Sequence, residues 1–260
     1  MKYMILVWAA TAALNVQAAS KLTAEDLSRK MIQNAYSQSE QSVYVMRLTS
    51  AEGSESVRKM KLWFKRGGES QAKLLIKFQE PADIRGTALL SVTDSARTDQ
   101  WLYLPKLKKT RRIKGGNESE SFLGSDFTVG DLTSVDNDKD RYTYTLTAEG
   151  KKCGDSLCHI LTGTPKASVD ASELPYSKKI IEVRADNFMS SRIEFFNAEG
   201  TLEKVMELKG IHKAGSGWVA DRMEMKNILT NHSTVIEVTS RDSSVIPTDS
   251  LFTQNQLEKN

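Results

Sequence analysis

The sequence predicts a mostly β protein, in which one N-terminal helix precedes an antiparallel sheet of about ten or eleven strands. Apolar residues recur with a period of two in one segment after another from Ser42 onward. Turn-forming segments such as Glu52-Gly53-Ser54 separate these segments at hairpin distances. No Pro- or Ser-rich linker and no internal repeat divides the chain, so we expect one domain. A sheet with so many strands must curl or split.

Residues 1–19 have the pattern of a secretory signal peptide. Lys2 precedes an apolar run over residues 4–14, and Val16-Gln17-Ala18 supplies a small-x-small cleavage signature. The run is shorter than the ~20 residues that a membrane-spanning helix needs, although an uncleaved anchor is the alternative. We expect cleavage near Ala18 or Ala19, followed by an exported single domain over residues 20–260.

A helix is predicted directly after the signal peptide. Thr23 and Asp26 form a capping-box pattern in which Asp takes the place of Glu. Apolar side chains then recur at helical spacing, at Leu27, Met31, Ile32 and Ala35. This apolar stripe is available to cover one face of the sheet.

Each strand that follows carries one apolar face. The first three have these faces at Tyr44, Met46 and Leu48, at Met60, Leu62 and Phe64, and at Leu74, Ile76 and Phe78. Further strands are predicted over residues 88–92, 100–104, 142–146, 180–184, 192–196, 202–208, 219–229 and 236–238. The faces at Met223 and Met225 suit an adaptable pocket or an ordinary core equally well.

The segment 114–134 interrupts the strand pattern. It begins with polar residues and continues with an apolar set on irregular or short helical backbone, namely Phe122, Leu123, Phe127 and Leu132. We interpret it as a tethered lid. The alternative is a simple connection whose apolar side chains cap a core.

Two cysteines, Cys153 and Cys158, flank the turn-forming residues Gly154, Asp155 and Ser156. Disulfides persist in exported proteins, so we expect a disulfide that closes a hairpin. A metal site would recruit His159, but His212 and His232 are distant in the sequence and no second ligand pair is present. We therefore expect no metal.

The charges are balanced overall but concentrated at one place. Thirty-six basic and 33 acidic residues give a net charge of +3, which does not fit a general polyanion binder, and export disfavours nucleic acid. Six cations lie within residues 106–114, at Lys106, Lys108, Lys109, Arg111, Arg112 and Lys114. Such a run either protects a sheet edge from aggregation or attracts anionic lipid headgroups or an acidic partner.

The motifs of catalysis and calcium binding are incomplete. Gly154-Asp-Ser-Leu157 resembles the block of a serine esterase family, with Ser156 as nucleophile, but the Asp-x-x-His element of that family is missing. The acids at 136–140 alternate as in a calcium loop, yet Arg141 stands at the sixth position and Thr147 at the twelfth. We expect neither an enzyme nor a cofactor.

Four stretches resemble a known family. They are EPADIRGTALLSV at 80–92, DQWLYLPKLKKTRRI at 99–113, ESFLGSDFTVGDL at 120–132 and IPTDSLFTQNQL at 246–257. Together they resemble the outer-membrane lipoprotein-sorting protein family, the extended relatives of the periplasmic carrier LolA and of LolB. The resemblance covers most of the chain after the signal peptide.

The resemblance implies a curved, unclosed half-barrel whose concave apolar face is covered by the N-terminal helix and the lid. The pocket beneath would take acyl chains, each buried CH₂ contributing about 0.8 kcal/mol. The ligand contacts we expect are Leu62, Phe64, Ile76, Phe78, Leu90, Trp101, Tyr103, Phe122, Leu123, Phe127 and Leu132. By analogy with the carriers, Arg85 is expected to hold the lid closed.

The function that follows is a non-enzymatic, monomeric periplasmic carrier or chaperone. It would bind lipoprotein acyl chains or free lipid and transfer them toward the outer membrane, with transient contact to the membrane surface. One alternative is an accessory or sensor subunit of an RND-type inner-membrane exporter that uses the same fold. A hydrolase acting through Ser156, and a filled β-barrel without a cavity, are the others.

Overall fold

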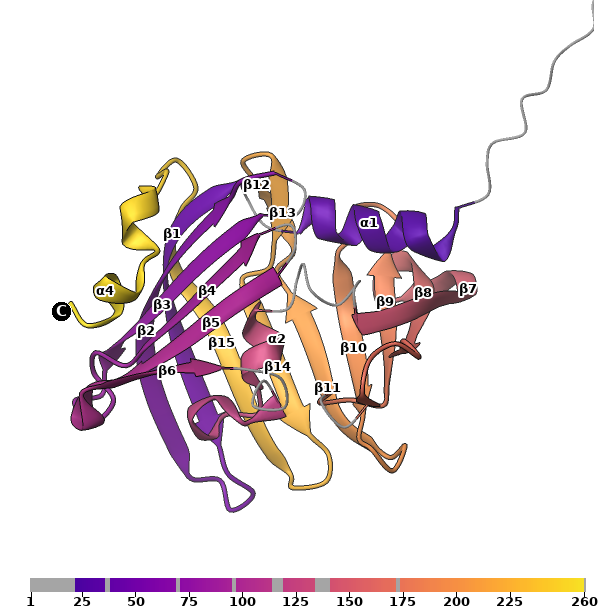
Figure 1. The fold of residues 1–260 in the computed structure, drawn as a ribbon. Coiled ribbons are helices and arrows are strands. Elements are labelled where there is room, and N and C mark those ends of the chain that lie inside the picture. The colour runs from indigo at the N-terminus through magenta and orange to yellow at the C-terminus, as the bar shows by residue number, and fades with distance from the viewer. Residues whose placement is uncertain are drawn as a thin grey trace, which may run out of the picture.

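The computed structural model describes residues 22–35, 38–68, 71–94, 97–113, 119–133, 141–171 and 174–259 (Figure 1). Its helices are α1 (Ala24–Asn34), α2 (Val129–Thr133) and α4 (Gln254–Leu257), and its short 3₁₀ turns include η1 (Pro105–Leu107), η3 (Phe122–Gly124) and η6 (Asp249–Leu251). The strands are β1 (Ser39–Thr49), β2 (Glu55–Arg66), β3 (Ala72–Glu80), β4 (Ala88–Asp94), β5 (Arg97–Leu104), β6 (Lys109–Ile113), β7 (Tyr142–Cys153), β8 (Ser156–Pro165), β9 (Lys178–Arg184), β10 (Ser190–Phe196), β11 (Leu202–Lys209), β12 (His212–Ala214), β13 (Gly217–Val219), β14 (Arg222–Asn227) and β15 (His232–Asp242).

Thirteen of these strands form one antiparallel sheet, in the order β6-β5-β4-β3-β2-β1-β15-β14-β11-β10-β9-β8-β7. Within the described residues β6 and β7 end this order without pairing with each other, so the sheet is an unclosed half-barrel. Figure 1 shows the sheet curling around α2, while α1 lies across the ends of β8, β9 and β10. The mostly β, half-barrel fold class is confirmed.

The sheet has more strands than the about ten or eleven that periodicity predicts. The basic residues of β6 are mostly exposed, and therefore the strand lacks an apolar face that alternation could reveal. β8 was also absent from the predicted set. The predicted strand over 219–229 was wrong in its bounds, because Val219 ends β13 and Leu229 is exposed in the turn after β14.

The N-terminal helix begins as its capping pattern predicts. The Asp26 backbone N–H donates to Thr23 Oγ1 at 3.0 Å, and the Thr23 N–H donates to Asp26 Oδ2 at 3.4 Å. Leu27 is fully buried against Leu161, Ile181 and Val183 of β8 and β9. The capping box thus places the first apolar turn of α1 directly on the concave face of the sheet.

Strands β2–β5 are apolar on both faces. Leu62, Ile76, Leu89 and Leu102 are paired in register across these strands and belong to the concave-face core. The neighbouring row, Trp63, Leu75, Leu90 and Trp101, is also paired in register and belongs to a second cluster on the convex face. Successive side chains on a strand point to opposite faces, so each row is one residue out of step with the other.

The C-terminal segment covers the convex row. Phe252 and Leu257 are buried against Leu75, Ala88 and Leu90. Asp249 accepts from Lys65 Nζ at 3.0 Å and from Lys73 Nζ at 2.8 Å, which ties η6 to β2 and β3. The stretch 246–257 therefore seals the outer face of the half-barrel rather than its cavity.

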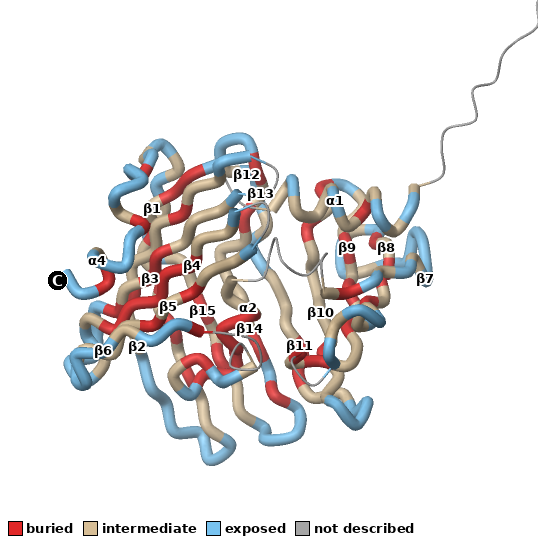
Figure 2. Tube along the Cα trace, viewed as in Figure 1, coloured by how far each residue is buried: buried red, intermediate tan, exposed pale blue. Residues whose placement is uncertain are grey.

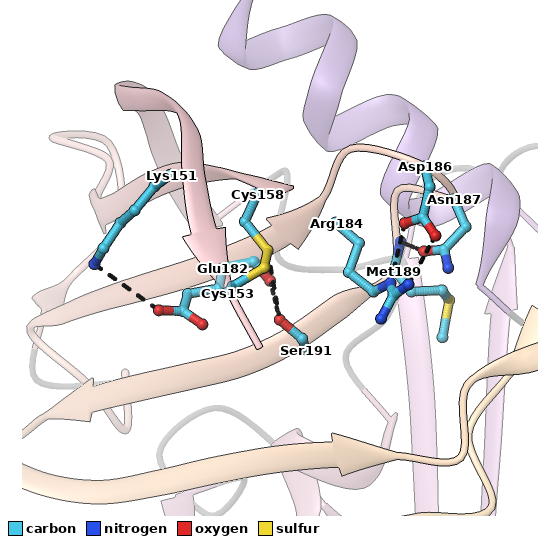
Figure 3. Close-up of a disulfide and its surroundings, with 9 residues drawn as sticks. All are labelled: Lys151, Cys153, Cys158, Glu182, Arg184, Asp186, Asn187, Met189 and Ser191. Carbon is cyan, nitrogen blue, oxygen red and sulfur yellow. Dashed lines mark hydrogen bonds and ion pairs between the residues drawn. A yellow bond between two sulfur atoms is a disulfide. The ribbon is translucent and has the colours of Figure 1, made fainter. Parts of the chain in front are cut away.

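The disulfide between Cys153 and Cys158 is confirmed, with a Cα–Cα distance of 5.9 Å (Figure 3). It closes the β7–β8 hairpin at one edge of the sheet, and Cys158 Sγ lies 3.8 Å from Ser191 Oγ of β10. Because Cys158 is fully buried, the crosslink fixes the hairpin end against the sheet.

None of the described helices combines the length and apolarity needed to cross a bilayer.

Replacing Leu89 with Ala tests the assignment of the concave core. Leu89 is fully buried, so L89A is expected to lower the free energy of unfolding by about 3 kcal/mol. Leu107 is 61% exposed, and L107A is the control, with an expected change below about 0.5 kcal/mol. Urea unfolding followed by tryptophan fluorescence measures both values. Equal effects would contradict the assigned core.

Candidate functional site

An apolar cavity of about 260 Å³ lies between the concave face, α1 and the lid segment. Its lining includes the following apolar side chains: Met31 and Ile32 of α1, Leu62, Phe64, Leu74 and Ile76 of β2 and β3, Ile181, Ile193, Phe195, Met206 and Met223 of the opposite half, and Phe127 and Leu132 of the lid. Apolar walls with few polar groups are typical of sites for apolar small molecules.

The structure separates the predicted ligand contacts into three groups. Leu62, Phe64, Ile76, Phe127 and Leu132 line the cavity. Phe78, Phe122 and Leu123 belong to the packed core beside it, where the Phe78 and Phe122 rings lie 5.7 Å apart. Leu90, Trp101 and Tyr103 are packed under the C-terminal segment on the opposite face.

The assignment of Leu90, Trp101 and Tyr103 to the cavity therefore does not hold. Leu90 is paired with Trp101, and both point to the convex side because their neighbours Leu89 and Leu102 point to the concave side. Alternation alone could not decide between the faces, because both are apolar in these strands.

The lid itself is compact within its described part, residues 119–133. The Phe122 N–H donates to the Phe127 carbonyl at 2.8 Å, and Ser121 forms a bridge with Thr128. Leu123 (φ 53°) and Gly124 (φ 76°) are both left-handed, which turns the chain sharply at η3. Phe122 and Phe127 of the lid are both buried.

Asp126 anchors the lid to β15. Its carboxylate accepts a hydrogen bond from Thr234 Oγ1 at 2.6 Å and lies 2.6 Å from His232 Nδ1. Its backbone N–H donates in turn to Thr234 Oγ1 at 3.0 Å. Asp126 and Thr234 are both buried, so these bonds form out of contact with water, where an unpaired partner is costly.

Asp131 anchors the other end of the lid. Its carboxylate accepts from the Thr128 N–H at 2.8 Å and from the Tyr176 hydroxyl at 2.9 Å. Burial raises the pKa of Asp131, although the charges of Lys179 and Lys204 oppose that shift. Burial and the charge of Asp131 raise the pKa of Tyr176 well above its usual value.

A third lid contact comes from β5. Gln100 donates from Nε2 to Thr133 Oγ1 at 2.7 Å, and Thr133 Oγ1 donates to the Val129 carbonyl at 2.8 Å. Arg85, expected to hold the lid, is exposed in the β3–β4 turn and donates from Nε to the Gln79 carbonyl at 2.9 Å. The lid contacts of the structure thus come from other residues, and the role assigned to Arg85 stays a prediction.

A buried ion pair lies at another part of the cavity lining. Arg241 Nε is 3.4 Å from Glu40 Oε2, and its Nη1 is 3.1 Å from Asp221 Oδ1. Arg241 Nη2 also donates to the Ala220 carbonyl at 2.9 Å. Burial, together with the Glu40 charge, raises the pKa of Tyr44 to about 12. This network ties β1 and β15 to the β13–β14 connection, a role that no sequence pattern indicated.

The described residues do not form the side-chain arrangements that the hydrolase and metal-site alternatives need. Ser156 lies in the disulfide-closed hairpin, and no hydrogen bond between described residues joins it to a histidine. The described residues contain no group of three side chains suited to a metal ion. The acids at 136–140 and Lys114 lie outside the described residues.

The fold and cavity together define a class: an open antiparallel half-barrel with a lidded apolar pocket, the LolA-like fold. A DUF1329 family protein from Desulfovibrio piger is 29% identical, with a TM-score of 0.81, and the match covers 89% of this chain and 96% of that one. A putative outer membrane lipoprotein-sorting protein domain from Vibrio parahaemolyticus is 24% identical, with a TM-score of 0.81 and coverage of 91% and 98%. A LolA superfamily protein from Nitrosomonas europaea is 21% identical, with a TM-score of 0.70 and coverage of 90% and 99%.

A family model described as an uncharacterized protein matches residues 70–259, and the chain belongs to that family. No curated protein matches the chain in sequence. The family match begins before β3 and runs to the C-terminal segment, so it includes the lid and its partners Gln100, Tyr176 and Thr234.

Replacing Thr234 with Val tests the first lid anchor. T234V removes both hydrogen bonds to Asp126 while keeping the volume of the side chain, so we expect the lid to open more often. Amides of the lid should exchange with deuterium at least about tenfold faster. T239V is the control, because Thr239 lies on the same strand but is exposed and bonds the Val43 carbonyl. Unchanged lid exchange in T234V would contradict the anchor.

The raised pKa of Asp131 predicts the direction in which protein stability changes with pH. An acid whose pKa is higher in the folded state opposes folding once it ionises, and the penalty is absent at low pH where both states are protonated. D131N stays neutral and can still accept from the Tyr176 hydroxyl. The stability of the wild type relative to D131N should therefore fall as pH rises through and above the ordinary Asp pKa of about 3.9. Urea unfolding across pH measures this difference, and a constant or rising difference would refute it.

Proposed function

We propose that this protein is a carrier that binds acyl chains of a lipid or a lipid-modified protein in its lidded cavity. The observation that supports this most directly is a cavity with apolar walls whose cover is attached through a few polar contacts. Burial of acyl chains is favourable by about 0.8 kcal/mol per CH₂, so binding needs no catalytic group. The chain thus acts by holding and releasing, not by chemistry.

The lining suits ligands of more than one shape. Met31, Met189, Met206 and Met223 contribute flexible side chains to the wall, and Met fills irregular spaces with little strain. The wall therefore adapts to acyl chains of different length or number. Polar groups that line the cavity, such as Lys179 and Asp131, already interact with each other, which leaves the apolar surface as the main determinant.

Release requires the lid to move, and the anchors make that movement reversible. Asp126 and Asp131 hold the lid through directional hydrogen bonds to β15 and to Tyr176. Hydrogen bonds contribute about 1 kcal/mol net each, or about 1.5–3 kcal/mol where one partner is charged, and their directionality favours one closed position of the lid. We propose that the cargo leaves when these two contacts separate.

The proposed compartment is the periplasm, and the proposed direction is toward the outer membrane. The signal-peptide pattern of the sequence and the disulfide both suit an exported protein. The similar structure from Vibrio parahaemolyticus is described as a putative outer membrane lipoprotein-sorting domain, which makes a lipoprotein the first cargo to test.

Replacing Leu62 with Trp tests the cavity. Leu62 lines the cavity from β2, so L62W is expected to fill part of it and to weaken uptake of a fluorescent fatty acid at least about tenfold. V57W is the matched control, because Val57 is exposed on the same strand outside the cavity. Fluorescence titration measures the affinity, and thermal unfolding checks that both variants fold. Full uptake by a folded L62W would overturn the cavity as the site.

A further inference from the structure

The β5–β6 hairpin ends in a basic tip with one exposed leucine. The tip consists of residues 106–109, and Lys106, Leu107, Lys108 and Lys109 are all exposed. Figure 2 colours the backbone at the end of the β5–β6 hairpin pale blue, the colour of exposed residues. Leu107 is 61% exposed, among the highest values for a large apolar side chain in the described chain. An isolated exposed leucine is ordinary, but one enclosed by three lysines at the end of a hairpin is a distinct surface.

The tip has a fixed backbone. Pro105 begins η1, and Lys108 ends it in the left-handed region at φ 48°. The Lys108 N–H donates to the Pro105 carbonyl at 3.0 Å, which closes the turn. The three lysines and Leu107 are therefore presented together at the edge of the sheet.

The cations of the tip are not neutralised within the described part of the chain. Arg111 pairs with Glu120 at 2.8 Å, and Arg112 pairs with Asp99, so the acids engage the stem of the hairpin. None of the ion pairs between described residues engages Lys106, Lys108 or Lys109. The positive charge of the basic run is thus concentrated at its tip.

We propose that this tip docks the protein on the surface of a lipid bilayer with anionic headgroups. The lysines would lie among the headgroup phosphates, and Leu107 would enter the boundary of the acyl region. Protection of a sheet edge explains charges along β6, but it explains neither a leucine at the tip nor lysines beyond the paired strand. A protein partner needs a larger apolar centre than one side chain.

The expected strength is moderate and depends on salt. Each lysine near an anionic membrane contributes about fivefold to binding, which is about 1 kcal/mol converted to a ratio. Three lysines then give about a hundredfold preference for anionic over neutral bilayers. Salt screens exposed charges, so the preference should shrink as ionic strength rises. Contact of this strength is reversible, as a shuttling protein would require.

Vesicle co-sedimentation with the full chain tests the proposal. The wild type is expected to bind vesicles that contain phosphatidylglycerol and not vesicles of phosphatidylcholine alone. K106E/K109E should weaken binding at least about tenfold. L107D should also weaken binding, and its effect should be larger at high salt than at low salt, because salt screens the lysines but not the apolar contact. The N-terminal segment is the same in every variant, so differences in binding report on the tip.

Two matched controls separate the tip from net charge and from exposed apolar area. K152E/K213E makes the same change of charge at exposed positions of β7 and β12, and L157D replaces another leucine, 56% exposed. Both are expected to bind as the wild type does. Equal losses in the tip and control variants would overturn the proposal, as would a wild type that fails to bind anionic vesicles.

A further readout keeps this proposal distinct from the carrier function. K106E/K109E is expected to take up the fluorescent fatty acid as the wild type does, because the tip lies outside the cavity lining. If K106E/K109E proves unfolded by thermal unfolding, K106A/K109A replaces it, with a smaller expected loss of vesicle binding. Normal vesicle binding by a folded tip variant would overturn the membrane contact. It would leave an acidic protein as the alternative partner of the tip.

Discussion

A long antiparallel sheet that curls without closing leaves a concave apolar face that must be covered. Thirteen strands provide this face; α1 and the lid lie over it as two short covers, and Trp218 and Val219 of β13 also line the cavity. Neither cover fills the space completely, and a cavity of about 260 Å³ remains. The cavity therefore follows from the mismatch between a large curved sheet and the small elements that cover it.

The two covers are attached in different ways. α1 packs through apolar contacts such as Leu27 against Leu161, which are non-directional and strongest when fully buried. The lid combines buried aromatic residues with hydrogen-bonded carboxylates, Asp126 on Thr234 and Asp131 on Tyr176. Buried polar contacts define one closed position and are costly when left unpaired. This difference makes the lid, rather than α1, the element suited to open and close.

The sequence predicted most of what local patterns encode. The Thr23–Asp26 capping box, the Cys153–Cys158 hairpin and the antiparallel strands all follow from spacing and turn chemistry. It could not assign faces in β2–β5, where both are apolar, and so it predicts Trp101 in the cavity although Trp101 packs against the convex-face cluster that contains Phe252. Nor could it find the lid anchor, because Asp126 and Thr234 are 108 residues apart and meet only in the folded sheet.

The claim that the cavity carries acyl chains is tested most directly by native mass spectrometry of the protein purified without detergent. The predicted spectrum contains the folded chain together with a discrete added mass, which solvent extraction then identifies as a lipid or an acylated peptide. Such a mass would also name the cargo that the apolar lining alone does not distinguish. A chain that is empty in this spectrum, and that also fails to take up a fluorescent fatty acid, would contradict the account.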